Sequence, residues 1–282
     1  GGMRMRLIAF GGDARTDGVL DAAEKAGWET LHITGEYGAE IPSADAVLLP
    51  WARSFRENGL VVQQGEKSMT RESVLAKIPP CAAALVGRDV RDEELPQVGR
   101  VILPDGDERF LRLNARLTAE GAMMTLMRVR KRALLSSTAV ITGYGRIGQE
   151  MAARLCAMGT FVIVCARSEE QMRMAHAAGA HPVPLSRLAA ACRQADVIVN
   201  TIPAHVLGAD ALEAIGRDTP IVELASPPYG MDMQESVRRG LQVCVEGGLP
   251  GRYAPMDAGG ALFDALARGM EEIEEGEEKA DE

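Results

Sequence analysis

The sequence has few cysteines, no long apolar segment and no concentration of positive charge. Its five cysteines are scattered and mostly set in apolar runs such as VIVCA, which is typical of reduced core residues in a cytosolic protein. No apolar stretch approaches the ~18 residues that a membrane-spanning helix needs, and the first residues lack the apolar core of a secretory signal peptide. We therefore expect a soluble, cytoplasmic protein with no membrane partner.

The net charge of −9 is concentrated at the end of the chain. The last twelve residues, EEIEEGEEKADE, hold eight acids and one lysine, so the remainder is nearly neutral. Binding to nucleic acid needs a basic surface that neutralises phosphates, and none is evident, so no nucleic acid is expected as a partner. Residues 276–282 are interpreted as a solvated acidic tail, with a docking segment as the alternative.

Length and composition predict two domains. A chain of 282 residues that is 46% hydrophobic buries one large core or two ordinary ones, and the strand and helix patterns fall into two groups. In residues 3–112 a helix is expected at 16–26 among apolar strands, which predicts a flavodoxin-like open α/β sheet on the substrate side. The strands are expected at 6–10, 28–33, 44–50, 82–87 and 99–103. The polar connection at 51–67 is interpreted as either a lid or a disordered loop.

A second α/β domain is predicted in residues 113–255, where a linking helix at 114–132 precedes a regular alternation of strands and helices. Met124 and Met127 recur with two leucines at helical spacing on this helix, which we interpret as core packing. The alternation is typical of a Rossmann-type doubly wound parallel sheet. The strands are expected at 139–142, 161–166, 197–200, 221–224 and 242–245. The helices are expected at 146–158, 169–178, 186–193 and 233–239. A last helix at about 256–275 is expected to pack on the first domain.

A glycine pattern follows the first strand of this second domain. Gly143, Gly145 and Gly148 have the spacing G-x-G-x-x-G and open a helix, which predicts a tight turn and a helix N-terminus that faces a pyrophosphate. A tight turn without a ligand is the alternative. The predicted cofactor-binding loop also includes the intervening residues Tyr144, Arg146 and Ile147.

The next strand ends on a cation, where NAD-binding domains usually carry an acid for the ribose hydroxyls. Arg167 can pair bidentately with a ribose 2′-phosphate, and Ser168 can donate a further hydrogen bond. This predicts NADP rather than NAD as the cofactor. The alternative is an arginine that caps the strand in solvent, close to Glu169 and Glu170.

Polar and small residues stand at the ends of two further strands, where a nicotinamide would lie. Thr201 and Pro203 follow one strand, and Ala225 and Ser226 follow the next. These residues can position the ring, although such residues are also common in turns. His205 could move a proton near neutral pH, with a surface histidine at a helix start as the alternative.

The motifs GGDAR, NARLTAEGA, GYGRIGQEMA, ARS, NTIPA, ELAS and GLPGRYAP occur in an order that resembles the A-subunit of dipicolinate synthase from end to end. The resemblance implies an NADP-dependent oxidoreductase that oxidises a CH–CH bond, converting dihydrodipicolinate to dipicolinate in sporulation. It also implies the flavoprotein-like B-subunit of dipicolinate synthase as a partner. We further expect a homo-oligomer.

Two departures from that family concern positive charge. Family members usually carry a cation and then P-G-G after the A-S pair, where this chain has PPYG at 227–230. They also carry P-K-T-A-G where this chain has PMDAG at 255–259. Two cationic positions are therefore absent although the substrate is a dianion, which leaves the substrate more open than the fold or the cofactor.

The implied reaction needs hydride departure, loss of a ring proton to a base, and groups that hold two carboxylates. The candidates for binding the carboxylates are Arg15, Arg88, Arg252, Asn114 and Thr118. Glu120 or His205 would be the base, and Glu120 is preferred because its helix also carries Asn114 and Thr118. We expect these groups to converge with the 143–148 loop in a cleft between the domains, without a metal site. For each arginine, a solvated surface charge is the alternative.

Two other functions stay open. The domain order also resembles 2-hydroxy-acid dehydrogenases, but those enzymes place a catalytic histidine after the last strands of the nucleotide domain. This chain has no histidine beyond His205. The second alternative is a non-catalytic subunit that senses a dinucleotide.

Overall fold

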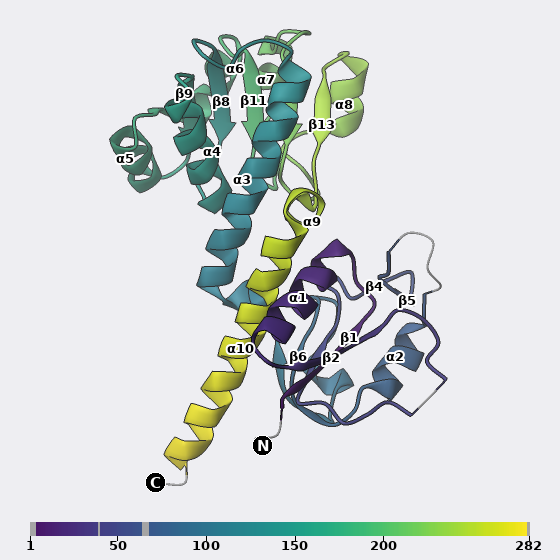
Figure 1. Cartoon of the computed structure of the whole chain (residues 1–282). Helices are drawn as coiled ribbons and strands as arrows, with labels where there is room; N and C mark the ends of the chain where they lie inside the picture. Colours follow the sequence, from purple (N-terminus) through teal and green to yellow (C-terminus); the bar gives the residue numbers. More distant parts are fainter. Residues whose placement is uncertain (1–3, 39, 64–67, 281–282) are drawn as a thin grey trace. The chain divides into compact units, whose positions relative to one another are not determined.

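The computed structural model describes residues 4–38, 40–63 and 68–280, and the side chains as far as residue 272. Its contacts divide the chain into two compact units, one of residues 1–114 with 250–282 and one of residues 115–249 (Figure 1). Each unit holds a parallel sheet with helices, which confirms the predicted α/β fold class. No helix in the described part of the chain is long and apolar enough to cross a membrane.

The first unit is built on a five-stranded parallel sheet in the order β2-β1-β3-β6-β7. When the small hairpin of β4 (Phe55–Arg56) and β5 (Gly59–Leu60) is left out of the numbering, this is the flavodoxin-like order, as predicted. The strands are β1 (Arg6–Phe10), β2 (Glu29–Ile33), β3 (Ala46–Leu48), β6 (Cys81–Leu85) and β7 (Val98–Ile102). Successive residues of β1 alternate between two hydrophobic clusters, Leu7 in one and Ile8 in the other, so the sheet is buried on both faces.

Two helices cover one face of this sheet. Helix α1 (Ala14–Lys25) begins at Asp13, whose side chain accepts a hydrogen bond from the backbone N–H of Arg15 at 3.0 Å. Helix α10 (Pro255–Ala280) packs alongside α1 (Figure 1). The two backbones approach closely because Gly18 lacks a side chain: a Cβ atom there would lie 2.6 Å from the carbonyl oxygen of Met256. The acidic tail predicted at 276–282 lies beyond the described side chains, although the helix backbone continues to Ala280.

The opposite face is covered by a helix that the sequence reasoning missed, α2 (Arg71–Lys77), whose Val74 is fully buried. Part of the connection expected at 51–67 forms the antiparallel hairpin of β4 (Phe55–Arg56) and β5 (Gly59–Leu60). Phe55 and Leu60 are buried in the same cluster as Val74, so this part of the connection is not a disordered loop. Residues 64–67 lie outside the described chain.

The second unit is a six-stranded parallel sheet in the order β10-β9-β8-β11-β12-β13. In chain order this is 3-2-1-4-5-6, the doubly wound Rossmann arrangement that the sequence predicts. The strands are β8 (Thr138–Thr142), β9 (Phe161–Ala166), β10 (His181–Pro184), β11 (Val197–Asn200), β12 (Ile221–Glu223) and β13 (Val243–Val245). Strand β10 was not predicted because it contains two prolines, and the edge position tolerates their missing N–H groups.

Short helices connect these strands. They are α4 (Arg146–Ala157), α5 (Glu169–Ala177), α6 (Leu188–Cys192), α7 (Ala209–Ala214) and α8 (Met233–Arg238), while α9 (Leu249–Tyr253) follows the last strand, β13. Helix α7 was not predicted. All five cysteines are free thiols, and burial raises the pKa of Cys165 and Cys192 to about 12.

The long helix α3 (Glu108–Arg130) corrects one expectation about packing. Met124 and Met127 were predicted to lie in the core, but they are 51% and 50% exposed. Instead, Ala119, Met123 and Leu126 are buried, and with Ala122 they recur at i, i+3, i+4 and i+7. The buried stripe is therefore displaced by one residue, and its alanines gave a weaker signal than the exposed methionines.

Candidate functional site

The three glycines of the loop between β8 and α4 each meet a different steric requirement. Gly143 has φ +86°, and a Cβ atom on it would lie 2.8 Å from Thr201 Oγ1. A Cβ atom on Gly148 would overlap the carbonyl oxygen of Gly143. Gly145 is the N-cap of α4 and has open space around its α-carbon. The loop therefore makes a tight turn, packs closely on its helix, and leaves its middle glycine open to a ligand.

The N-terminus of α4 has the form of an anion-binding site. Gly145 supplies no side-chain cap to the first N–H groups of this 12-residue helix, which begins at Arg146. Ile147 is partly exposed, while Tyr144 is buried, which raises the pKa of its hydroxyl. Gln149 Nε2 donates to the carbonyl oxygen of Tyr144 at 3.2 Å and so holds the loop. A pyrophosphate would meet the backbone N–H groups at the start of α4 here.

Arg167 and Ser168 follow β9, at the side of the sheet where a ribose would lie. Ser168 is the N-cap of α5, and its Oγ accepts from the backbone N–H of Gln171 at 3.1 Å, which leaves its hydroxyl hydrogen available. Arg167 is exposed, and within the described residues its guanidinium has neither a hydrogen bond nor an ion pair. Neither Glu169 nor Glu170 forms an ion pair with it, so the donors of the guanidinium can pair with a phosphate.

A buried polar network lies under the ends of β8, β11 and β12. Asn200 is fully buried; its Oδ1 accepts from the hydroxyl of Thr142, and its Nδ2 donates to Glu223 Oε1 at 2.7 Å. Thr201 Oγ1 donates to the carbonyl oxygen of Thr142 at 2.6 Å. These bonds tie together the three strand ends beside the glycine loop. Glu223 was not among the predicted site residues, although the motif ELAS places an acid at the end of a buried strand.

The residues predicted for the nicotinamide side lie around this network. Ala225 is buried, and its N–H donates to Glu223 Oε1 at 2.8 Å. Pro203 and Ser226 are exposed. His205 is also exposed, and its Nε2 lies 3.1 Å from the carbonyl oxygen of Pro228. His205 is thus placed next to the loop that follows β12.

In the first unit, Arg15 lies in the first turn of α1, at the end of the GGDAR segment that was expected to bind a ligand. Its Nε donates to Asp13 Oδ1 at 2.9 Å, and its side chain is only 16% exposed. Burial alone would raise the pKa of Asp13, but the hydrogen bond and charge of Arg15 lower it below its ordinary value. The Arg15 guanidinium also lies 5.6 Å from the ring centroid of Trp51.

Arg88 approaches the same indole. Its guanidinium lies 6.0 Å from the ring centroid of Trp51, and its Nε donates to Asp105 Oδ2 at 2.9 Å. The hydrogen bond to Asp105 raises the pKa of Arg88, although the side chain is 61% exposed. The indole N–H donates to the same Asp105 oxygen at 3.2 Å. Two arginines, each held by an aspartate, therefore lie against Trp51.

Arg252 belongs to the same unit as Arg15. Its guanidinium lies 5.4 Å from the ring centroid of Tyr253. A Cβ atom on the preceding Gly251 would lie 3.1 Å from Arg15 Nε. The structure therefore brings the segments GGDAR and GLPGRYAP together, as a shared site requires.

The candidates on α3 are separated by the turn of the helix. Thr118 is buried, with 9% exposure, whereas the side chain of Glu120 is 62% exposed and lies 3.7 Å from Arg154. Residues two apart on a helix point about 200° apart, so Glu120 is not on the face of Thr118. Asn114 is partly buried on the same helix. The role of Glu120 as the base and the expected cleft between the domains both stay predictions.

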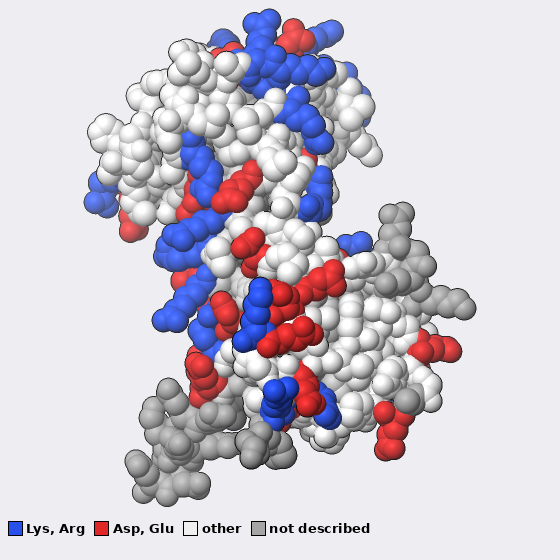
Figure 2. Space-filling model, in the orientation of Figure 1, with Lys and Arg blue, Asp and Glu red and all other residues white. Residues whose placement is uncertain are grey.

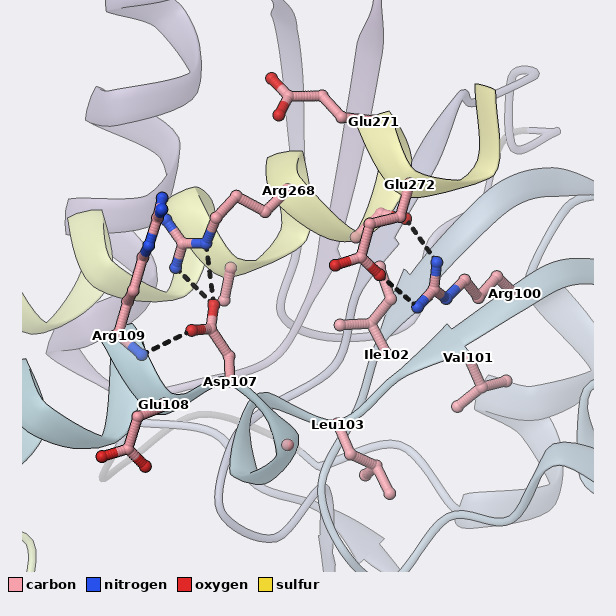
Figure 3. Close-up of a pocket in the computed structure, with 13 residues that line it drawn as sticks. Arg100, Val101, Ile102, Leu103, Asp107, Glu108, Arg109, Arg268, Glu271 and Glu272 are labelled. Atoms are coloured by element: carbon pink, nitrogen blue, oxygen red, sulfur yellow. Dashed lines mark hydrogen bonds and ion pairs between the residues drawn. The ribbon is translucent and has the colours of Figure 1, made fainter. Parts of the chain in front are cut away.

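A cavity of about 580 Å³ lies in the first unit between β7, the following turn and α10 (Figure 3). Its lining is polar but largely self-paired: Arg100 Nη2 binds Glu272 at 2.7 Å, and Arg268 Nε binds Asp107 at 2.9 Å. Figure 2 likewise shows acidic and basic side chains next to each other on this unit. The cavity contains none of the predicted site residues. Within the described residues, no three His, Cys, Asp or Glu side chains form a metal-binding group.

Comparison with known proteins supports a dinucleotide-binding, dehydrogenase-like role. Residues 108–226 match the family described as D-isomer specific 2-hydroxyacid dehydrogenase, NAD binding domain. The chain is also 31% identical over 162 residues to the dipicolinate synthase A-subunit of Bacillus subtilis (strain 168), which covers 57% of this chain and 54% of that protein. The sequence match thus spans about half the length of this relative. The domain match supports a nicotinamide dinucleotide as the cofactor.

Solved structures extend the likeness to nearly the whole chain. The crystal structure of the dipicolinate synthase A-subunit from Bacillus halodurans has a TM-score of 0.83 and 25% identity, covering 94% of this chain and 97% of that one. The apo-structure of D-lactate dehydrogenase from Escherichia coli has a TM-score of 0.66 at 14% identity, covering 96% of this chain and 98% of that one, and so shows the fold alone. The predicted resemblance to the A-subunit of dipicolinate synthase is confirmed.

Proposed function

We propose that this chain is an NADP-dependent oxidoreductase that converts dihydrodipicolinate to dipicolinate, in the role of the A-subunit of a dipicolinate synthase. The observation that carries the proposal is the combination of the glycine loop with Arg167, an exposed guanidinium that no other described residue pairs. The likeness to the dipicolinate synthases supports the substrate class.

Features of the second unit support the proposed binding of a dinucleotide. Positions Gly143 and Gly148 admit no Cβ atom without overlap, and the N-terminus of α4 has no side-chain cap. The pyrophosphate would be held there, and Arg167 with Ser168 would hold the ribose 2′-phosphate. When bound, NADP supplies a hydride acceptor.

Arg15 and Arg88 are proposed to hold the substrate carboxylates in the first unit, with Arg252 nearby. The two arginines lie against Trp51, and the aspartates that bind them fix the direction of their remaining N–H groups. A guanidinium has five N–H donors, so one that bonds an aspartate still has donors for a substrate carboxylate. The proposed role of these residues is to bind and orient the dianion.

The ring proton must pass to a base, and the structure favours His205 over Glu120 for this role. His205 lies beside the loop after β12, while Glu120 is paired with Arg154 on the exposed face of α3. General bases contribute roughly 10²- to 10⁴-fold, so His205→Asn is expected to lower kcat within that range with little change in KM. Glu120→Gln is the matched comparison. A loss of kcat in Glu120→Gln alone would identify Glu120 as the base instead.

The deciding experiment supplies freshly generated dihydrodipicolinate with NADP and follows the absorbance of NADPH. The assay is run with and without the B-subunit of a dipicolinate synthase, because the resemblance implies that partner. We expect NADPH to form only when both dihydrodipicolinate and NADP are present. No change under either condition contradicts the proposed reaction.

A second candidate is oxidation of a 2-hydroxy acid, because residues 108–226 match that dehydrogenase family. The same assay with D-lactate and other 2-hydroxy acids tests it. The resemblance to dipicolinate synthase extends across both units, so dihydrodipicolinate is expected to be the better substrate.

A further inference from the structure

Glu223 is a buried carboxylate that the proposed reaction does not use. It is the last residue of β12 and is fully buried, and within the described part of the chain no lysine or arginine pairs with it. Its oxygens instead accept from Asn200 Nδ2 at 2.7 Å and from the N–H groups of Ala225 and Gly230, each at 2.8 Å. Burying an acid costs free energy unless such bonds compensate, and apolar residues often fill such positions with equal stability. A carboxylate here therefore suggests a specific task.

What Glu223 holds is the loop of residues 225–230. Two of its residues, Pro227 and Pro228, have no N–H group, so the loop has few donors with which to fix itself. Tyr229 has φ +67°, which is unfavourable for a bulky residue and persists only where the surroundings impose it. The bonds from Ala225 and Gly230 to one carboxylate clamp both ends of this loop.

The same carboxylate connects to the neighbouring strand end. Asn200 donates to Glu223 and to the carbonyl oxygen of Ile202 at 3.0 Å, so the loop after β11 depends on the same network. Gly230 packs so closely that a Cβ atom on it would overlap Asn200 Nδ2. Displacing Glu223 would therefore move two loops together.

The loops after β11 and β12 lie at the carboxyl ends of strands in the second half of this sheet. In a 3-2-1-4-5-6 sheet, each half binds one mononucleotide at the carboxyl ends of its strands. The half with β8, β9 and Arg167 would take the adenosine part of NADP. The loops after β11 and β12 then face the nicotinamide part.

We infer that Glu223 is a positioning residue, which acts through Asn200 and the 225–230 loop to shape the site for the nicotinamide half of the dinucleotide. The inference rests on the proposed binding of NADP. Glutamine at this position has the same shape but only one acceptor oxygen, so at least one of the three N–H groups would face another donor.

The test compares two probes on Glu223→Gln by calorimetric titration. NADPH contains both halves, whereas adenosine 2′,5′-bisphosphate reaches only the adenosine half. We expect the variant to bind NADPH roughly 10- to 100-fold more weakly, as the loss of a buried hydrogen bond implies, and to bind the bisphosphate as the wild type does. A merely structural role would weaken both probes equally, and that result, or unchanged binding of both, overturns the inference.

Two further variants keep the test decisive. Glu246→Gln is the control, because Glu246 is also buried and follows the neighbouring strand β13. Unlike Glu223 it pairs with an arginine, Arg128 at 3.6 Å, and it also accepts from Thr125 Oγ1 at 2.8 Å; we expect this variant to bind both probes normally. If Glu223→Gln does not fold, Gly230→Ala displaces the loop without altering the carboxylate, and the same selective loss is expected. Wild-type protein that binds neither probe would instead refute the proposed function.

Discussion

The preference for NADP over NAD is the prediction that the structure defines best. Arg167 is exposed and without a partner among the described residues, so it brings an unneutralised charge to the end of β9. Hydrogen bonds to charged groups contribute about 1.5–3 kcal/mol, and solvent screening at an exposed site reduces this to about 1–2 kcal/mol, or roughly 5- to 30-fold in Kd. NADP is therefore expected to bind more tightly than NAD by that factor in calorimetric titration.

Replacing this one side chain should reverse the order of affinities. In Arg167→Asp the carboxylate repels a 2′-phosphate but can accept from the 2′-hydroxyl of NAD. Arg173→Asp is the control, because it makes the same change of charge at an exposed position of the neighbouring helix α5. Equal affinities of the wild type for NADP and NAD, or the same reversal in Arg173→Asp, would refute the assignment.

Three further predictions concern the glycine loop between β8 and α4, the aspartate beside Arg15, and Arg252 as a group that binds the substrate. Gly148→Ala places a Cβ atom on the carbonyl oxygen of Gly143, so the free energy of unfolding should fall by about 1–3 kcal/mol in denaturant titration and NADP binding should weaken. Because the folded-state pKa of Asp13 lies below its ordinary value of 3.8, its ionised form stabilises the fold above that pH and loses the effect as the pH falls through the folded pKa. Asp13→Asn, which can still cap α1, should therefore be less stable than the wild type at neutral pH, and the difference should close in acid; a difference independent of pH would contradict this. Arg252→Ala should mainly raise KM, since carboxylate binding is needed in both the ground state and the transition state; a fall in kcat alone would contradict a binding role.

The sequence predicted the elements whose signals are local. The G-x-G-x-x-G spacing indicates positions where a side chain would not fit, and in the structure a Cβ atom on Gly143 or Gly148 would overlap neighbouring atoms. Strand β10 was missed because the prolines in HPVP argue against a strand, and only its edge position, a property of the whole sheet, permits it. On α3 the exposed methionines suggested the wrong face, because a buried stripe that contains alanines has little hydrophobic contrast.

The site residues that the sequence did not reveal are those defined by distant partners. Arg88 was one of three candidate arginines, but its partners Asp105, 17 residues later, and Trp51 were not predicted. Glu223 gave no motif of its own, because its donors are backbone N–H groups two and seven residues further along and the amide of Asn200. A sequence does not show which backbone N–H groups donate to a side chain. Only the folded loop therefore shows that the Glu223 carboxylate has hydrogen-bond donors.

The two arginines that lie against Trp51 leave little net positive charge around it. Asp13 binds Arg15 and Asp105 binds Arg88, so each pair is close to neutral before any ligand arrives. A dianion held there would gain directed hydrogen bonds from the two guanidinium groups but little net charge attraction from these two ion pairs. The proposed site therefore relies more on the geometry set by two aspartates than on excess positive charge, and it should bind its dianion with a weak dependence on salt.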